Sequence, residues 1–177
     1  MPLPDRITVL GAGSWGTALA VVLTRNVEIV TLWGRNEPQM AAINQARQNE
    51  RYLPGIDLPD NLVATSDLET AVADCVNFLV AVPSRAFRET VTALGKLSQN
   101  SSGDAAVLTI VSATKGFDPA SNGLLSDTVQ ELLGDAAVFG IISGPSFAAE
   151  TAAAATKTAA AARLWRLNAL KYRRCRV

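Results

Sequence analysis

Residues 7–16 read Ile7-Thr8-Val9-Leu10-Gly11-Ala12-Gly13-Ser14-Trp15-Gly16, and this stretch decides the fold. A short apolar run with β-branched side chains leads into a GxGxxG loop, and the helix-forming residues 17–23 follow directly. Strand, glycine loop and helix in this order are the context in which GxGxxG binds a dinucleotide. The alternative interpretation is a glycine-rich turn with no ligand.

The three glycines have different expected roles. Gly11 permits the tight turn out of the strand, Gly13 lets backbone approach a pyrophosphate, and Gly16 lets the helix pack closely on the strand. The start of the helix then offers unpaired N–H groups and the positive end of its dipole to phosphates. We therefore predict that Gly11, Gly13 and Gly16 belong to a nucleotide site.

The composition is that of one globular domain, with 177 residues of which 49% are hydrophobic. No apolar run approaches the roughly 20 residues of a membrane helix, and the N-terminus lacks a signal-peptide pattern. Cys75 and Cys175 are expected to be free thiols of a cytoplasmic protein. The chain has no histidine, which excludes His-based zinc sites, Ser-His-Asp triads and a histidine general base. No metal site is predicted.

Residues 151–177 differ from the rest of the chain. They begin with an alanine run and hold seven of the 16 basic residues but none of the 16 acidic ones. We expect a nucleotide-binding domain over residues 1–150 and an Ala/Arg-rich tail over residues 151–177 outside its fold. The composition of this tail is the one that a truncated or shifted reading frame gives. A tail that binds nucleic acid or an acidic membrane is the alternative, but the acidic body opposes such partners.

Strand and helix signals alternate through the first 150 residues. The run 76–82 is almost continuously apolar, which is typical of a central parallel strand buried on both faces. Residues 49–61 contain three breakers and are expected to form a loop. The pattern predicts an α/β fold, a doubly wound, mostly parallel sheet of Rossmann type, with ligands outside the carboxyl ends of the strands. The other expected strands are 27–33, 62–65, 105–111 and 138–143, and the expected helices are 38–48, 66–73, 124–133 and those that begin after Pro83 and Gly144.

Six loop motifs together resemble the N-terminal domain of bacterial NAD(P)-dependent glycerol-3-phosphate dehydrogenase, over about residues 5–150. The family reduces dihydroxyacetone phosphate to sn-glycerol 3-phosphate with NADH or NADPH, for phospholipid precursor synthesis. The resemblance therefore implies NAD or NADP as cofactor, a small-molecule substrate and, for full-length members, a homodimer, without nucleic-acid binding or membrane insertion. The motifs are GAGSWGTA at 11–18, LWGR at 32–35, YLPG at 52–55, VPS at 82–84, ATKG at 113–116 and ISGPSFA at 142–148.

The resemblance assigns cofactor contacts to Ser14, Trp15, Tyr52 and Ala148. A helix N-cap and a core aromatic are the alternatives for Ser14 and Trp15. Tyr52, beside a proline and a glycine, could instead pin its loop. Ala148 would line the cofactor through its backbone or shape alone.

Arg35 follows the second expected strand, where an NAD-specific domain usually keeps Asp or Glu for the ribose hydroxyls. An arginine there can pair with a 2′-phosphate and stack on adenine. Glu37 is close enough to this position in the sequence that NAD remains a possible cofactor. We therefore expect NADP(H) to be accepted, and a solvated surface arginine is the alternative.

Lys115, at the carboxyl end of the fifth expected strand, is implied by the resemblance to contact both cofactor and substrate. Gly144 and Ser146 match the family's substrate contacts, and a backbone N–H and a hydroxyl at a helix start suit an anion. The alternatives are an exposed loop lysine and an ordinary turn with an N-cap.

The family's second, helical domain supplies the lysine that transfers a proton to or from the substrate. No residue of this chain matches it, so the catalytic residues stay unassigned and little or no turnover is expected from the chain alone. A non-catalytic nucleotide-binding fragment and another hydroxy-acid or phosphogluconate-type dehydrogenase remain alternatives.

Overall fold

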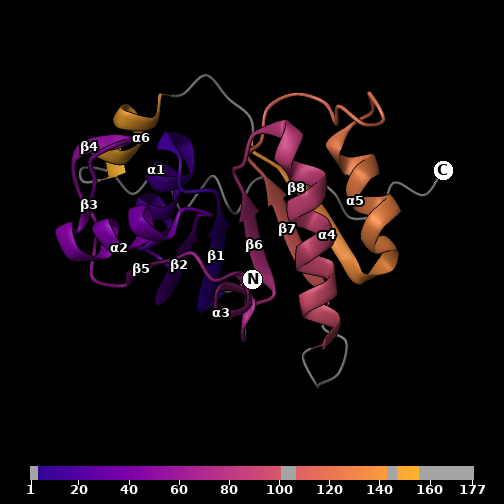
Figure 1. Cartoon of the computed structure of the whole chain (residues 1–177), viewed down its shortest axis with the longest axis horizontal. Helices are drawn as coiled ribbons and strands as arrows, with labels where there is room; N and C mark the ends of the chain where they lie inside the picture. Colours follow the sequence, from indigo (N-terminus) through magenta and orange to yellow (C-terminus); the bar gives the residue numbers. More distant parts are fainter. Residues whose placement is uncertain (1–3, 101–106, 143–146, 156–177) are drawn as a thin grey trace.

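The computed structural model describes residues 4–100, 107–142 and 147–155. Within them six parallel strands form one sheet in the order β5-β2-β1-β6-β7-β8 (Figure 1). The elements are β1 (Arg6–Leu10), α1 (Ser14–Leu23), β2 (Ile29–Trp33), α2 (Glu37–Ala46), β3 (Gln48–Asn49), β4 (Leu53–Asp57), β5 (Leu62–Thr65), α3 (Leu68–Val72), β6 (Asn77–Val80), α4 (Ser84–Asn100), β7 (Leu108–Ser112), α5 (Leu125–Leu133), the 3-10 turn η1 (Gly134–Ala136), β8 (Ala137–Ile141) and α6 (Ala148–Ala155).

Helices cover both faces of this sheet, and each face has its own apolar core. Alternate residues of β1 divide between the two cores, because successive side chains of a strand point to opposite faces. Ile7 and Val9 pack with side chains of α1 and α2, whereas Leu10 packs with those of α3, α4 and α5. The predicted doubly wound α/β fold is confirmed, and β6 lies inside the sheet as its apolar sequence indicates.

The expectation of a loop over residues 49–61 is wrong at residues 49 and 53–57. β3 and β4 form a small antiparallel pair there, separate from the main sheet. Pro54 and Gly55 are tolerated because a two-stranded pair consists only of edges, where a missing N–H costs little. Gly55 has a φ of +74°, a conformation that glycine adopts readily.

Helix α6 runs through the expected boundary at residue 150 and ends at Ala155. It packs against α1, and Ala152 is fully buried in a cluster with Ala18 and Leu53. The small side chains of Ala18 and Ala152 let α1 and α6 approach closely. The limits of the domain and the state of the tail stay predictions, since residues 156–177 lie outside the described residues. No helix of the described part is long and apolar enough to cross a membrane.

Candidate functional site

A cleft of about 690 Å³ lies beyond the carboxyl ends of β1, β2, β6 and β7. β1 and β6 are neighbours at the centre of the sheet, and the topological switch point lies between them. The loops that follow these two strands run to opposite faces of the sheet and leave a crevice. Its walls come from the glycine loop, the segment after β2, the β3–β4 turn, the loops after β6 and β7, and the start of α6. They comprise residues 11–15, 33–36, 39, 52, 81–83, 113–115, 147 and 148.

The glycine loop has the backbone that its sequence predicts. Gly11 has a φ of +123°, and a Cβ there would lie 2.6 Å from the carbonyl oxygen of Ala81. A Cβ on Gly16 would lie 1.8 Å from the carbonyl oxygen of Gly11, so this glycine sets how closely α1 returns to the turn. Gly13 is different, because no described atom other than those of Gly13 and its chain neighbours lies within 4 Å of its Cβ position. The space beside Gly13 is therefore open at the cleft.

The N-terminus of α1 faces the same cleft. Its N-cap is Gly13, which has no side chain to bond the first N–H groups, so the N-cap alternative for Ser14 is wrong. Trp15 is partly buried and packs against the core, yet its indole nitrogen is enclosed and has no hydrogen-bond partner among the described residues. An enclosed donor without an acceptor is unfavourable, so both features favour an electronegative ligand here.

Arg35 lies at the cleft on the segment that follows β2. Its guanidinium is 3.8 Å from the carboxylate of Glu89 on α4, and the two side chains are 66% and 76% exposed. So exposed a pair contributes little to stability, and Arg35 can exchange Glu89 for another anion at small cost. Glu37 begins α2 and is exposed nearby.

Lys115 is exposed on the loop after β7 and contributes to the cleft wall. The preceding residue fixes the start of this loop, because the Thr114 hydroxyl donates to the carbonyl of Val82 at 2.8 Å. Val82 belongs to the loop after β6. Two cleft-forming loops are thus joined by one hydrogen bond.

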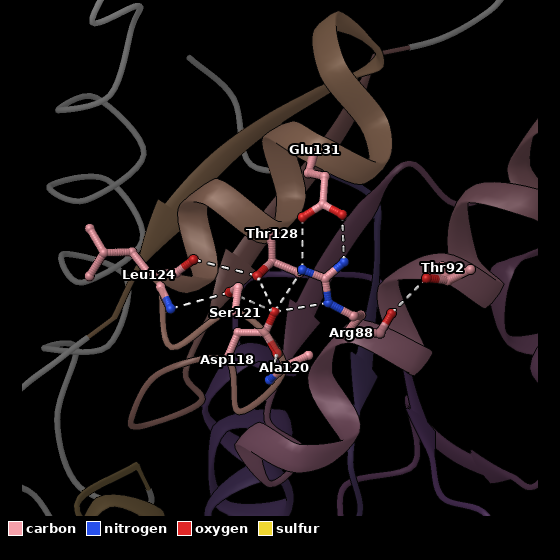
Figure 2. Close-up of polar contacts among 9 residues, drawn as sticks. Arg88, Thr92, Asp118, Ala120, Ser121, Leu124, Thr128 and Glu131 are labelled. Carbon is pink, nitrogen blue, oxygen red and sulfur yellow. Dashed lines mark hydrogen bonds and ion pairs between the residues drawn. The ribbon is translucent and has the colours of Figure 1, made fainter.

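A second anchor holds the loop after β7 at Asp118, and Figure 2 shows the polar contacts of this residue. Arg88 of α4 donates from Nε to Asp118 Oδ2 at 2.8 Å, and its Nη2 forms an ion pair with the same oxygen at 2.7 Å. The same guanidinium makes two further bonds of 2.8 Å to the carboxylate of Glu131 on α5. Such paired bonds to a planar guanidinium fix its orientation. Arg88 therefore ties the loop to both helices.

Asp118 is only 2% exposed, and its carboxylate bonds both within the loop and to the two neighbouring helices. Its carboxylate accepts from the hydroxyls of Ser121 and Thr128, each at 3.1 Å, and from the backbone N–H of Ala120 at 3.1 Å. The hydrogen bonds from Arg88, followed by that from Ala120, lower the pKa of Asp118 to about 2. They favour the charged form, so Asp118 stays ionised at neutral pH.

The pKa values of Glu131 and Arg88, the other two members of this cluster, also shift toward favouring the charged forms. The Arg88 hydrogen bonds lower the pKa of Glu131, and those to Glu131 and Asp118 raise the pKa of Arg88. None of the three lines the described cleft wall. Their arrangement supports the Lys115 loop from behind, and sequence patterns did not point to it.

The structure brings eight of the predicted site residues to one cleft. Gly16 packs behind the glycine turn instead of lining the described wall, and Gly144 and Ser146 lie outside the described residues. Tyr52 is 38% exposed, with the Arg51 guanidinium 5.2 Å from its ring centre. The eight residues at the cleft are Gly11, Gly13, Ser14, Trp15, Arg35, Tyr52, Lys115 and Ala148.

Sequence reasoning missed several residues of the wall. Gly34 leaves no room for a side chain, because a Cβ would lie 2.8 Å from Met40 Cε and 2.9 Å from Ala12 Cβ. Phe147, at the start of α6, lines the cleft although it is 75% exposed. The signal that could have found them is position, since Gly34 lies within the LWGR motif at 32–35 and Phe147 within the ISGPSFA motif at 142–148. Ala12, Trp33, Asn36, Gln39, Ala81, Val82, Pro83, Ala113 and Thr114 complete the set.

A parallel sheet wound on both faces, with a glycine turn and a helix N-terminus at its switch point, defines a Rossmann-type domain, the class that binds dinucleotides in this crevice. Residues 6–165 match the family described as NAD-dependent glycerol-3-phosphate dehydrogenase N-terminus. The chain belongs to this family, and it corresponds to the family's N-terminal part.

Individual relatives agree with this assignment. Glycerol-3-phosphate dehydrogenase [NAD(P)+] of Stenotrophomonas maltophilia (strain R551-3) is 48% identical over 146 residues, which are 82% of this chain and 41% of the relative. The same enzyme of Xanthomonas euvesicatoria pv. vesicatoria is 46% identical over 145 residues. The crystal structure of glycerol-3-phosphate dehydrogenase from Coxiella burnetii superposes with a TM-score of 0.75 at 39% identity, covering 84% of this chain and 43% of that one. This chain thus spans about two fifths of the length of its relatives.

Proposed function

We propose that this chain is the nucleotide-binding half of an NAD(P)-dependent glycerol-3-phosphate dehydrogenase, which interconverts dihydroxyacetone phosphate and sn-glycerol 3-phosphate. The observation that carries the proposal is the cleft itself. It joins the open face of Gly13, the start of α1 and the loop of Lys115 in one crevice. The names of the relatives support NAD or NADP as the cofactor.

The described residues fit such a cofactor. Gly13 leaves the space that a pyrophosphate needs, and the first turn of α1 supplies N–H donors. Arg35 would take the adenosine end, with Tyr52 and Trp15 as apolar walls. When bound, the nicotinamide would supply hydride transfer. Lys115, which lines the cleft on the loop after β7, would hold the substrate's phosphate or hydroxyl, with Gly144 and Ser146 as further proposed contacts.

Proton transfer is the part that this chain leaves open. Reduction of a ketone needs a proton donor near the new hydroxyl. Lys115 sits on an exposed loop and is the only lysine at the described cleft wall. We infer that this step requires the remainder of a full-length enzyme, as do dimerisation and completion of the substrate pocket.

The first test is nucleotide binding by the purified chain. Titration with NADH and NADPH, followed by fluorescence, is expected to give saturable binding with dissociation constants in about the micromolar range. Addition of dihydroxyacetone phosphate is expected to cause no oxidation of NADPH. A folded chain that binds neither nucleotide contradicts the proposal, and measurable turnover contradicts the assignment of proton transfer to another part of the enzyme.

Arg35→Ala is expected to weaken NADPH binding about tenfold more than NADH binding. The reason is that a guanidinium facing a 2′-phosphate makes charge-assisted bonds that NADH cannot make. Both dissociation constants are measured at low and physiological salt. Glu89→Gln is the matched control, because it removes the competing carboxylate and should strengthen NADPH binding. Equal losses for the two nucleotides in Arg35→Ala would exclude the 2′-phosphate role.

A further inference from the structure

The carbonyl of Ala12 is held by two side chains from other elements. Ala12 lies between Gly11 and Gly13, inside the glycine turn. The Asn49 amide of β3 donates to this carbonyl at 3.1 Å, and the Gln39 amide of α2 donates to it at 3.1 Å. The glycine turn, which has a local sequence signature, is therefore also held by side chains from β3 and α2.

Asn49 is the stronger of the two anchors. Its side chain is 1% exposed, and the same Nδ2 also donates to the hydroxyl of Thr17 at 2.8 Å. Thr17 is fully buried in the first turn of α1. One amide group thus bridges the backbone before Gly13 and the helix after it, and both of its hydrogens are used.

The bridge acts on the peptide group that precedes Gly13. A trans peptide is planar, so its carbonyl and its N–H point in opposite directions. Because the Ala12 carbonyl is turned toward Asn49, the N–H of Gly13 is turned away from β3. Gly13 lines the cleft, and the space on the Cβ side of its backbone is open.

The β3–β4 pair carries this buried amide at its edge toward the glycine turn and α1. The pair stands apart from the main sheet, and its turn supplies Tyr52 to the cleft wall. The backbone carbonyl of Asn49 accepts from the N–H of Tyr52 at 3.2 Å. Asn49 therefore connects two parts of the wall, the glycine turn and the Tyr52 turn.

We propose that Asn49 is a positioning residue, which orients the glycine turn for the pyrophosphate of the dinucleotide through the Ala12 carbonyl. This inference rests on the proposed nucleotide-binding function. It makes the small β3–β4 pair a support of the phosphate site. Asn49 itself need not touch the ligand.

The test compares two asparagines of the same chemistry. Asn61 also donates its amide to two backbone carbonyls, Thr24 at 2.8 Å and Val27 at 3.0 Å, but at the far end of α1 and outside the cleft wall. NADH affinity of Asn49→Ala and Asn61→Ala is measured well below each thermal midpoint, so that both are folded. We expect both midpoints to fall, Asn49→Ala to lose about tenfold or more in affinity, and Asn61→Ala to lose less than about twofold.

Equal affinities of the two variants would overturn the positioning role while NADH binding by the unmodified chain still supports the proposed function. No binding by the unmodified chain would instead overturn the function. Asn49→Asp serves if the alanine variant does not fold, because it keeps the side-chain volume and removes the amide donors. Unchanged NADH affinity in Asn49→Asp would also overturn the proposal.

Discussion

Gly16→Ala is expected to prevent stable folding of this domain, with a loss of at least about 4 kcal/mol in the free energy of unfolding. The added Cβ would lie 1.8 Å from the carbonyl oxygen of Gly11 and 3.3 Å from the Cβ of Ala81. The oxygen belongs to the backbone of the tight turn and cannot rotate away as a side chain would. Relief requires α1 to move off the sheet, which opens the core around it. Circular dichroism during heating measures the effect.

Gly13→Ala is the matched control in the same motif. Beyond Gly13 and its chain neighbours, no described atom lies within 4 Å of its Cβ position, so we expect a change of less than about 1 kcal/mol in the free energy of unfolding. The new methyl group would occupy the space proposed for the pyrophosphate, and NADH affinity should fall at least about tenfold. A Gly16→Ala variant as stable as Gly13→Ala would contradict the packing argument. Unimpaired NADH binding by Gly13→Ala would contradict the phosphate site.

Asp118→Asn is expected to lower the thermal midpoint by roughly 5 °C at neutral pH. The carboxylate is buried and accepts from Arg88, Ser121, Thr128 and the backbone of the loop, and a neutral amide cannot replace all of these bonds. Glu131→Gln is the control, since it removes the other carboxylate of Arg88 at a side chain that is 59% exposed. It should lower the midpoint by less than about 2 °C.

The same carboxyl predicts a pH dependence. The pKa of Asp118 is about 2 in the folded chain, below the unfolded value of about 3.9. Its stabilising contribution is therefore present above about pH 4 and is lost as the pH falls toward 2. The difference in midpoint between the unmodified chain and Asp118→Asn should be constant from pH 5 to 8 and shrink below pH 4. A difference that grows on acidification would show that Asp118 is not held in its charged form.

The α/β architecture could be predicted because its signals are local. Strand β5 begins and ends at the residues expected, and the apolar run 76–82 contains β6 at the centre of the sheet. The β3–β4 pair could not be predicted, because Pro54 and Gly55 indicate a loop wherever a neighbouring strand is unknown. Its pairing depends on tertiary contacts, notably the buried cluster of Leu53 with Ala18 and Ala152.

The residues of the candidate site also divide into those that the sequence could predict and those that it could not. Motif residues such as Gly13, Arg35 and Lys115 were found, since each follows a strand whose carboxyl end faces the crevice. Gly34 and Phe147 were missed, as was the cluster of Arg88 with Asp118 and Glu131. Arg88 and Glu131 are 43 residues apart, and no local pattern relates an arginine of one helix to a carboxylate of another.

The sequence by itself determined the order of the strands and helices of the main sheet and the three glycine positions, because periodicity and backbone freedom act over a few residues, and its loop motifs carried the resemblance to the family. Only the tertiary structure decided how the glycine turn and the Lys115 loop are held. Asn49 reaches Ala12 across 37 positions of the chain, and Arg88 reaches Asp118 across 30. A buried hydrogen bond requires a partner at about 3 Å, and that distance exists only once distant segments have packed together.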